Sequence, residues 1–299
     1  MKKIISLFII SILIFSLSGC EISIPNFINN TTNESNQNID DYEKDYAELI
    51  KEIERLETEL EAYDNDKITY ADVMESINNC SQTYIKSNVM IETTGYKMFG
   101  PVKYDGVGGQ GSGVIFCESS DSQYYYCLTN NHVTYLDPQY THVTYKITDY
   151  KDNSYSGTLL FSSSSYDLAV LKFRKSTSSS DELTVLDIKT KNPSVGDLVI
   201  AIGQPEGQNN AVTIGKITDY TNISLSDGGS SSNVTFEVIK HTAPINHGSS
   251  GGVLIDLDGN IVGINYAGSY TESGIFMHAY SIPIEKVIEY LTNNGFILK

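Results

Sequence analysis

The sequence is poor in basic residues and has no long apolar run. Its 20 Lys and Arg residues are outnumbered by 37 Asp and Glu residues, so the formal net charge at pH 7 is −17. Because such a chain repels a phosphate backbone, we expect no nucleic-acid partner. The most apolar stretch, Ile4 to Leu17, is too short for a typical membrane-spanning helix. Tyrosine is abundant instead, with 21 residues, and it accompanies many Ser, Thr, Val and Ile residues, which favours β structure.

The N-terminus has the pattern of an export signal. Lys2 and Lys3 precede the apolar stretch, which is followed by Ser18-Gly19-Cys20. A positive start, an apolar middle and small residues before a cleavage point are typical of a secretory signal peptide. The small residues before Cys20 also resemble the bacterial lipobox, in which the cysteine is lipidated. We therefore predict a signal peptide at residues 1–19, a lipid on Cys20 and an exported protein on the extracytoplasmic side of the cell membrane. An ordinary secretory signal is the alternative.

Only three other cysteines are present, namely Cys80, Cys117 and Cys127. Export would place them where disulfides can form. Cys117 and Cys127 flank a segment that has the pattern of a β-hairpin tip, so a cross-strand disulfide between them is possible. Cys80 is then left over, and the sequence leaves its pairing open.

Residues 20–80 differ in composition from the rest of the chain. Residues 20–41 are rich in Asn, Ser and Thr, which predicts a lipidated tether with little to bury. Residues 42–80 are expected to be helical, because apolar side chains recur at spacings of three and four, as in a coiled coil: Tyr46, Leu49, Ile53, Leu56, Leu60 and Tyr63. The stripe covers only about three heptads. Residues 42–63 could therefore pair with a second copy or pack on their own chain.

From residue 81 to 299 the pattern changes to short β-rich runs between clusters of Gly, Ser, Asn and Asp. This spacing predicts an all-β barrel or sandwich domain. One helix follows the strands: Pro283 suits its first turn and Asn294-Gly295 its end. Its apolar face, which we expect to pack on the last barrel, comprises Ile284, Val287, Ile288 and Leu291.

The segment INHGSSGGVL, from Ile245 to Leu254, fits two hydrolase signatures. Centred on Ser250, it matches the G-x-S-x-G elbow of the α/β-hydrolases, and it also resembles the G-x-S-G-G loop of trypsin-like serine proteases. An elbow must be followed by a helix. Here Asp258-Gly259 predicts a tight β-hairpin turn after Ser250, which excludes the elbow.

A chymotrypsin-type site needs His, Asp and Ser in that chain order, brought together from different barrel loops. His132 in LTNNHV, Asp167 in SSYDLAVLKF and Ser250 supply this order. Together with GQGSGVIF, VGDLVIAIGQP and NIVGINYAG, these segments resemble the HtrA/Deg family of trypsin-like serine proteases from about residue 89 to residue 288. Asp149 and Asp152 could replace Asp167 in principle, but they lack its position before a strand.

The resemblance implies two antiparallel β-barrels of the chymotrypsin type, preceded by an N-terminal helix and closed by a C-terminal helix. It implies a serine endopeptidase in which Ser250 is the nucleophile, His132 carries the proton and Asp167 orients His132. The backbone N–H groups of Gly248 and Ser250 would form the oxyanion hole. The expected substrate is extracytoplasmic, unfolded protein, and no metal or organic cofactor is implied.

The resemblance also suggests where the specificity pocket lies. Its floor is expected six residues before the nucleophile, and its proposed residues are Pro244, Ile245, Asn265, Tyr266, Ala267 and Gly268. Nothing at the floor, at Pro244 and Ile245, can pair with a basic substrate side chain, and burying an unpaired charge is costly. We therefore expect a small apolar pocket and cleavage after residues such as Val, Ala or Ile.

Two other interpretations of the sequence are a nucleotide-binding protein and a binding module without catalytic activity. GVGGQGSG, from Gly106 to Gly113, has the spaced glycines of a phosphate-binding loop, but no strand leads into it and no helix follows. A catalytically silent trypsin-like fold used as a surface binding module is the alternative to an enzyme. The sequence departs from the family at His247 and Ser249, where Pro and Asn are common, and we expect no PDZ domain after the closing helix.

Overall fold

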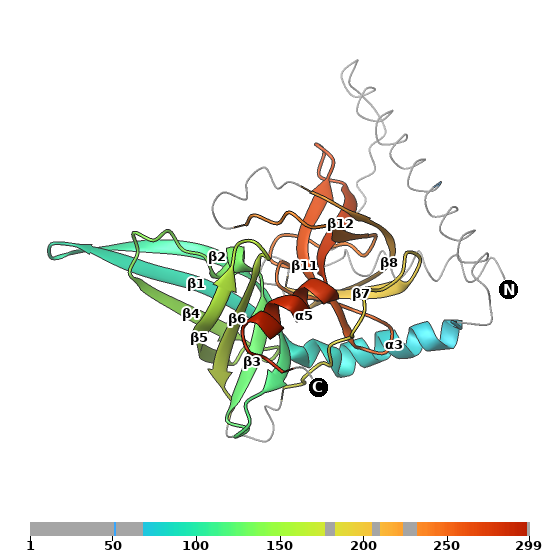
Figure 1. The fold of residues 1–299 in the computed structure, drawn as a ribbon, viewed down its shortest axis with the longest axis horizontal. Coiled ribbons are helices and arrows are strands. Elements are labelled where there is room, and N and C mark those ends of the chain that lie inside the picture. Colours follow the sequence, from blue (N-terminus) through green and yellow to red (C-terminus); the bar gives the residue numbers. More distant parts are fainter. Residues whose placement is uncertain (1–50, 52–67, 177–182, 205–209, 224–231, 298–299) are drawn as a thin grey trace, which may run out of the picture. The chain divides into compact units, whose positions relative to one another are not determined.

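The computed structural model describes residues 51, 68–176, 183–204, 210–223 and 232–297 (Figure 1). The chain divides into two compact units, Met1–Lys67 and Ile68–Lys299. The predicted signal peptide, Cys20, the tether and the stripe from Tyr46 to Tyr63 lie outside the described residues, so these remain predictions.

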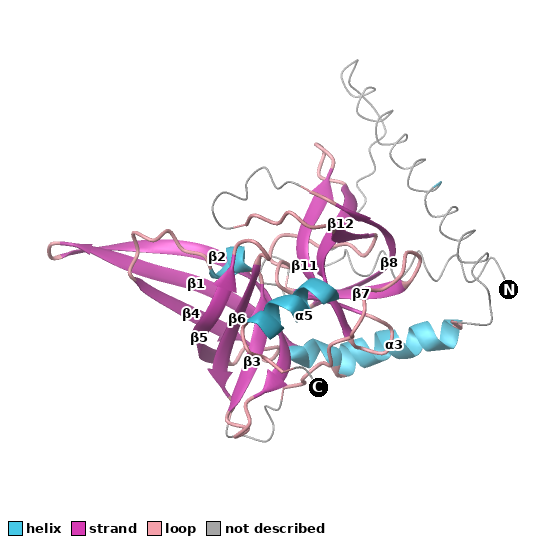
Figure 2. Cartoon of the chain, viewed as in Figure 1, coloured by secondary structure: helices cyan, strands magenta, loops and turns pink. Residues whose placement is uncertain are grey.

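The strands described in the second unit close into two antiparallel barrels of six strands each (Figure 2). The first barrel has the order β1-β2-β3-β6-β5-β4 and the second has the order β10-β11-β12-β9-β8-β7. The first barrel comprises β1 Asn88–Phe99, β2 Val102–Glu118, β3 Tyr124–Thr129, β4 His142–Thr148, β5 Ser154–Ser163 and β6 Leu168–Arg174. The second comprises β7 Leu198–Gly203, β8 Ala211–Thr221, β9 Val238–His241, β10 Val253–Ile255, β11 Ile261–Tyr270 and β12 Phe276–Pro283. The predicted fold of two antiparallel barrels is confirmed.

Each barrel has an apolar interior, and a third apolar cluster joins the two barrels. Strand β7 contributes to two of these clusters because alternate residues of a strand face opposite ways. Val199 and Ala201 pack inside the second barrel, whereas Ile200 and Ile202 belong to the shared cluster. Members of the shared cluster from the first barrel include Val114, Phe116, Leu128, Leu168 and Val170. Burial of both faces explains why β7 reads as an uninterrupted apolar run.

Four short helical segments accompany the barrels in the described part of the chain: α3 Tyr70–Gln82, η1 Tyr84–Ser87, α4 Asn131–Thr134 and α5 Ile284–Asn293. None of them is long and apolar enough to cross a membrane. Helix α3 begins with a capping box between Thr69 and Asp72. Near its end Cys80 is buried in the shared cluster, and Ser76 Oγ donates a hydrogen bond to the carbonyl oxygen of Leu257. Helix α3 therefore belongs to the compact unit Ile68–Lys299.

Helix α5 packs on both barrels. Pro283 is its N-cap, and its buried residues are Ile284, Val287, Tyr290 and Leu291. Tyr290 Oη donates a hydrogen bond of 3.1 Å to the carbonyl oxygen of Phe161 in β5. Just beyond the helix, the ring of Phe296 lies 5.4 Å from that of Phe116 and 5.7 Å from that of Phe161, measured between ring centroids. The predicted helix is present, and it also contacts the first barrel, which the sequence did not indicate.

The possible disulfide between Cys117 and Cys127 is wrong for this structure, in which both thiols are free. The two residues do lie on neighbouring strands, β2 and β3, as the hairpin pattern predicts. A bulge between Ile115 and Cys117 shifts the register, so Ile115 pairs with Cys127 and Cys117 pairs with Tyr126. Cys127 therefore points into the first barrel, while Cys117 packs on the shared cluster at the opposite face of the sheet. Side chains on opposite faces cannot meet the geometry of a disulfide.

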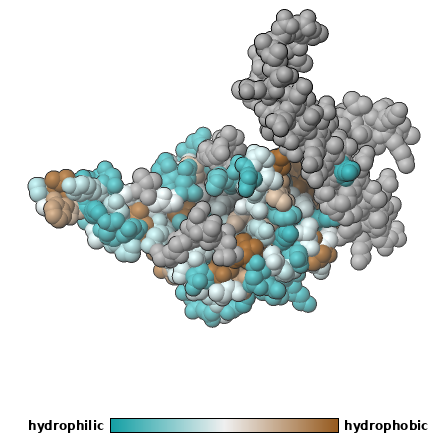
Figure 3. All heavy atoms as spheres, turned by 90° about the horizontal axis from the view of Figure 1, so that it is seen from above, coloured by the Kyte–Doolittle hydropathy of each residue, from teal (hydrophilic) through white to brown (hydrophobic). Residues whose placement is uncertain are grey.

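The hairpin formed by β1 and β2 extends away from the rest of the first barrel (Figure 1). Apolar side chains gather at its end (Figure 3), where Met98, Phe99 and Val102 are exposed.

Candidate active site

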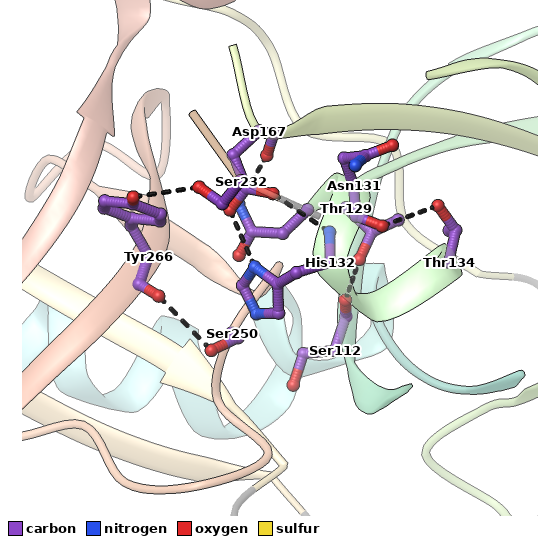
Figure 4. A network of polar contacts seen from close by, with 10 residues as sticks. Ser112, Thr129, Asn131, His132, Thr134, Asp167, Ser232, Ser250 and Tyr266 are labelled. Atoms are coloured by element: carbon purple, nitrogen blue, oxygen red, sulfur yellow. Dashed lines mark hydrogen bonds and ion pairs between the residues drawn. The ribbon is translucent and has the colours of Figure 1, made fainter. Parts of the chain in front are cut away.

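His132 and Asp167 come from the first barrel and contact each other directly. His132 lies on α4, which follows β3, and Asp167 immediately precedes β6. His132 Nδ1 lies 2.7 Å from Asp167 Oδ2, and the backbone N–H of His132 donates to Asp167 Oδ1 at 2.9 Å (Figure 4). This geometry assigns the proton to Nδ1, because a carboxylate can only accept. Nε2 of the neutral imidazole is then free to act as a base.

Asp167 is fully buried and held by its backbone as well as its side chain. Its φ of +48° is left-handed, a region that Asp tolerates better than most residues. Asn130 Nδ2 donates to the Asp167 carbonyl oxygen at 2.9 Å, which fixes this turn. Burial raises the pKa of Asp167, and the hydrogen bonds from His132 oppose that shift. The carboxyl group is therefore shielded from water and engaged mainly with the imidazole.

Ser250 comes from the second barrel, on the loop that precedes β10. Figure 4 shows it beside the edge of the imidazole that faces away from Asp167. Its Oγ donates to the carbonyl oxygen of Tyr266 over 3.4 Å, and no hydrogen bond joins it to His132 in the described structure. A contact of that length is weak. Rotation of the Ser250 side chain towards Nε2 is therefore opposed by little energy.

In the loop around Ser250, two backbone N–H groups have no acceptor in the described part of the chain. Their neighbours are paired: Ser249 N–H donates to the Asn246 carbonyl at 2.9 Å, and Gly251 N–H donates to the Asn265 carbonyl at 2.9 Å. Among the described residues, the N–H groups of Gly248 and Ser250 donate to no protein acceptor. Gly248 has a φ of +92°, which a residue with a side chain would rarely adopt. Two unpaired donors next to a nucleophile are the arrangement that an oxyanion hole requires.

The loop that carries Ser250 is tied to the first barrel by Ser112, on β2. Ser112 N–H donates to the Ser250 carbonyl at 2.7 Å, and Ser112 Oγ donates to the Gly248 carbonyl at 2.7 Å. Ser112 Oγ also accepts a 2.8 Å hydrogen bond from the N–H of Gln204, and Ser112 is fully buried. The sequence patterns did not indicate a role for Ser112. The sequence feature that could have indicated Ser112 is its hydroxyl group, which stands within a run of glycines on a buried strand.

The glycines around Ser112 allow a close approach of β2 to the segments that carry His132 and Ser250. A Cβ at Gly109 would lie 2.7 Å from the His132 carbonyl oxygen, and a Cβ at Gly111 would lie 2.7 Å from the Ser250 carbonyl oxygen. Both distances are shorter than real Cβ contacts. The run GVGGQGSG lies within β2, with no helix after it, which agrees with the rejection of a phosphate-binding loop.

The six residues predicted to form the specificity pocket lie in different settings. Ile245 is buried and joins the interior of the second barrel, while Tyr266 is buried with its hydroxyl 3.0 Å from Ser232 Oγ. Pro244, the expected floor, is exposed instead. The Asn265 side chain is buried in the barrel, where Nδ2 donates to the Ile202 carbonyl at 3.1 Å. Ala267 is half-buried and Gly268 is exposed.

The competing assignments have structural roles. After Ser250 the chain forms the antiparallel pair β10–β11, so there is no elbow helix. Asp256 accepts the N–H groups of Asp258 and Asn260 in the intervening turn. Asp149 accepts from the backbone of Lys151 and Asn153 in the β4–β5 turn. Among the described residues, no group of three His, Cys, Asp or Glu side chains could hold a metal ion.

Comparison with known proteins agrees with this geometry. Residues 111–264, slightly more than half of the chain, match the model of the trypsin-like peptidase domain. The chain is similar to the serine protease Do-like HtrB of Bacillus subtilis (strain 168), with 33% identity over 192 residues that cover 62% of this chain and 39% of the relative. It is also similar to the probable periplasmic serine endoprotease DegP-like of Hahella chejuensis (strain KCTC 2396), with 34% identity over 185 residues that cover 61% of this chain and 35% of the relative.

The chain thus spans less than half the length of each of these relatives. Among solved structures, the Rv3671c protease in its inactive form shares the fold, with a TM-score of 0.52 and 23% identity over 74% of this chain and 95% of that one. The predicted resemblance to HtrA/Deg proteases is confirmed by the Do-like and DegP-like relatives. The chain belongs to the family of trypsin-like peptidase domains.

Proposed function

We propose that this protein is a serine endopeptidase that cleaves unfolded extracytoplasmic proteins through an acyl-enzyme on Ser250. The observation that supports this most is the contact of 2.7 Å between His132 Nδ1 and Asp167 Oδ2, with the other edge of the imidazole turned towards Ser250 (Figure 4). A buried carboxylate that holds one imidazole nitrogen leaves the second nitrogen as a base beside a hydroxyl group.

In this mechanism the Ser250 hydroxyl leaves the Tyr266 carbonyl and turns to His132. As Ser250 Oγ bonds to the substrate carbonyl carbon, its proton moves to His132 Nε2. The Asp167 carboxylate stabilises the resulting imidazolium. His132 then gives the proton to the departing amine, which leaves an ester on Ser250. Water attacks this ester with His132 again as the base, and the second product leaves as an acid.

The negative charge that develops on the substrate oxygen needs donors that are already in place. The N–H groups of Gly248 and Ser250 are the proposed donors, because they have no acceptor among the described residues and belong to the loop of the nucleophile. Removal of one such donor from an enzyme of this type costs about 2.7–4 kcal/mol of transition-state stabilisation.

The proposed location is outside the cytoplasm, at the membrane. Lys2, Lys3 and the apolar stretch before Cys20 support export, as do relatives whose names describe them as periplasmic. We propose that Cys20 carries a lipid and that residues 42–63 are the candidate segment for self-association. Cys20→Ser is expected to release the protein from membranes or to leave its signal uncleaved. Unchanged membrane association of a cleaved Cys20→Ser protein would contradict the lipid anchor.

Labelling with a fluorophosphonate probe tests the proposed function directly. The purified full chain is expected to label at pH 8, to lose labelling in Ser250→Ala and to keep it in Ser249→Ala. The second variant is a matched control, since Ser249 is the neighbouring serine and its Oγ accepts only a 3.3 Å bond from Asn246 N–H. A folded protein that does not label, and that does not digest casein, would instead favour the binding module.

A further inference from the structure

Tyr270, at the end of β11, connects the two segments expected to flank a substrate side chain. Its hydroxyl donates to the carbonyl oxygen of Ile245 and lies 3.5 Å from Asn246 Oδ1. Its ring lies against Gly268, where an added Cβ would be 2.8 Å from Tyr270 Cε2 and 3.0 Å from its hydroxyl oxygen. Tyr270 therefore bridges the segment before the nucleophile and the segment 265–268.

Both bridged segments are close to Ser250 along the chain or in space. Ile245 lies on the loop that leads to the nucleophile. The other segment contains Tyr266, whose carbonyl oxygen accepts from Ser250 Oγ at 3.4 Å (Figure 4). When Ser250 attacks a peptide carbonyl, the side chain of that substrate residue is bonded to the adjacent carbon. This side chain must therefore lie near these two segments.

Two other residues of the predicted pocket lie in different settings. Pro244 is exposed, and the amide of Asn265 is directed into the barrel, where it donates to the carbonyl of Ile202. The ring of Tyr270 packs edge-on against the ring of Phe276, with a centroid separation of 5.9 Å. A supported aromatic ring between the two segments limits the space better than a flexible side chain would.

We propose that Tyr270 is the residue that determines specificity, because its ring closes the space for the substrate side chain and restricts cleavage to positions after small residues such as Ala and Val. This rests on the proposed serine endopeptidase function. It replaces the expectation that Pro244 forms the floor. The hydroxyl bond to Ile245 positions the ring, and the ring itself excludes larger side chains.

The test compares peptides that differ only in the residue before the scissile bond, which is Ala, Val, Leu or Phe. For the wild-type full chain, kcat/KM for Ala and Val is expected to exceed that for Leu and Phe by roughly tenfold or more. One methylene group too many in an apolar pocket lowers kcat/KM by about this factor. Tyr270→Ala is expected to raise kcat/KM for Leu and Phe by roughly tenfold or more. Tyr270→Phe, which keeps the ring, is expected to retain the preference for small residues.

Tyr220→Ala is the matched control. Tyr220 is half-buried in the same barrel, and its hydroxyl also donates to a carbonyl oxygen, that of Pro193. This variant is expected to keep the wild-type order of peptides, so a change confined to Tyr270→Ala does not reflect general loosening of the barrel.

Fluorophosphonate labelling separates the two ways in which the inference can fail. If the wild-type chain does not label, the proposed function is wrong. If the wild-type chain and Tyr270→Ala label at similar rates but rank the peptides in the same order, the assignment of Tyr270 is overturned. A Tyr270→Ala protein that does not fold is replaced by Tyr270→Leu, for which the same gain on Phe peptides is expected.

Discussion

Ser112 Oγ, on a strand of the first barrel, donates a 2.7 Å hydrogen bond to the carbonyl oxygen of Gly248, on the loop of the second barrel that carries Ser250. The same hydroxyl accepts from Gln204 N–H, and the Ser112 N–H donates to the Ser250 carbonyl. The position of Ser250 relative to His132 therefore depends on Ser112, which bonds to the Ser250 loop through both its side chain and its backbone.

Ser112→Ala should lower activity more than it lowers substrate affinity. The change removes the bond to Gly248 and leaves the buried N–H of Gln204 without a partner, which costs about 1–3 kcal/mol of unfolding free energy. We expect kcat to fall by roughly tenfold or more, because small displacements of reacting groups are costly, with KM nearly unchanged. Steady-state kinetics and urea unfolding measure the two effects. The exposed Ser156→Ala, also on a strand of the first barrel, is the control, and wild-type kcat in Ser112→Ala would contradict the role.

Asp167→Asn should abolish most of the activity without lowering stability at pH 7. The Asn oxygen can still accept the His132 backbone N–H, but its amide then donates to Nδ1, so Nε2 carries the proton and is no longer a base. A loss of about 10⁴-fold in kcat is expected from such a tautomer change.

The difference in melting temperature between Asp167→Asn and wild type should change with pH in a defined direction. Burial raises the pKa of Asp167, so the fold favours its protonated form. The stability that this group contributes is present below the ordinary carboxyl pKa of about 3.9 and is lost as pH rises through the raised value. The melting temperature of Asp167→Asn relative to wild type should therefore increase from pH 4 to pH 7. A relative decrease would show that the ionised carboxylate stabilises the fold.

His241 should make the protein sensitive to acid. It is fully buried, its Nε2 lies 3.0 Å from Ser281 Oγ, and its Nδ1 has no partner in the described structure. Burial lowers the pKa of His241 to about 3, so the fold favours the neutral ring. The corresponding stability is present above the unfolded pKa of about 6.5 and is lost as pH falls towards 3, with a slope of up to about 1.4 kcal/mol per pH unit.

His241→Gln should therefore have a shallower loss of unfolding free energy between pH 6 and pH 4 than wild type. Urea titrations at several pH values measure this slope. The exposed His142→Gln controls for the removal of a histidine elsewhere, and it should follow the wild-type curve. Parallel curves for wild type and His241→Gln would show that protonation of His241 is not linked to unfolding.

The thiols should resist alkylation until the protein unfolds. Cys80 and Cys127 are fully buried, and burial raises the pKa of the Cys80 thiol to about 12 and that of Cys117 to about 11. At pH 8 we expect slow modification of half-buried Cys117 and none of the other two within the same time. In urea without reductant, all three should react, as measured by intact-protein mass. If Cys117 and Cys127 remain unmodified in urea and react only after a reductant is added, they form a disulfide that this structure lacks.

The sequence predicted best what depends on local pattern. His132, Asp167 and Ser250 each stand at the end or start of an apolar run, so their positions could be found from neighbouring residues. Strand β7 forms from the apolar run of VGDLVIAIGQP, one of the segments that carry the family resemblance. The predicted pairing of Cys117 failed because a β-bulge adds one residue to its strand. The hairpin around Cys117 was correct, but the bulge after Ile115 turned Cys117 to the other face, and a shift of one residue reverses every side chain beyond it.

Contacts between segments distant in sequence were also not predictable. Ser112 and Gly248 are joined by a hydrogen bond that depends on how two barrels pack, and nothing adjacent to either residue indicates it. Tyr270 was missed for the same reason, since its partner Ile245 lies on a different segment. Pro244 is exposed, and its expected place at the floor of the specificity pocket remains a prediction.

The contacts of Tyr290 and Phe296 with the first barrel have a consequence for biosynthesis. Both residues follow the second barrel in the chain, so these contacts can form only after both barrels have emerged from a ribosome or a translocation pore. At common elongation rates, the first barrel precedes them by on the order of ten seconds. A nascent chain thus holds His132 and Asp167 well before Ser250 and the packing of α5 are available. In the proposed mechanism, an unfinished copy that ends before Ser250 therefore has no nucleophile.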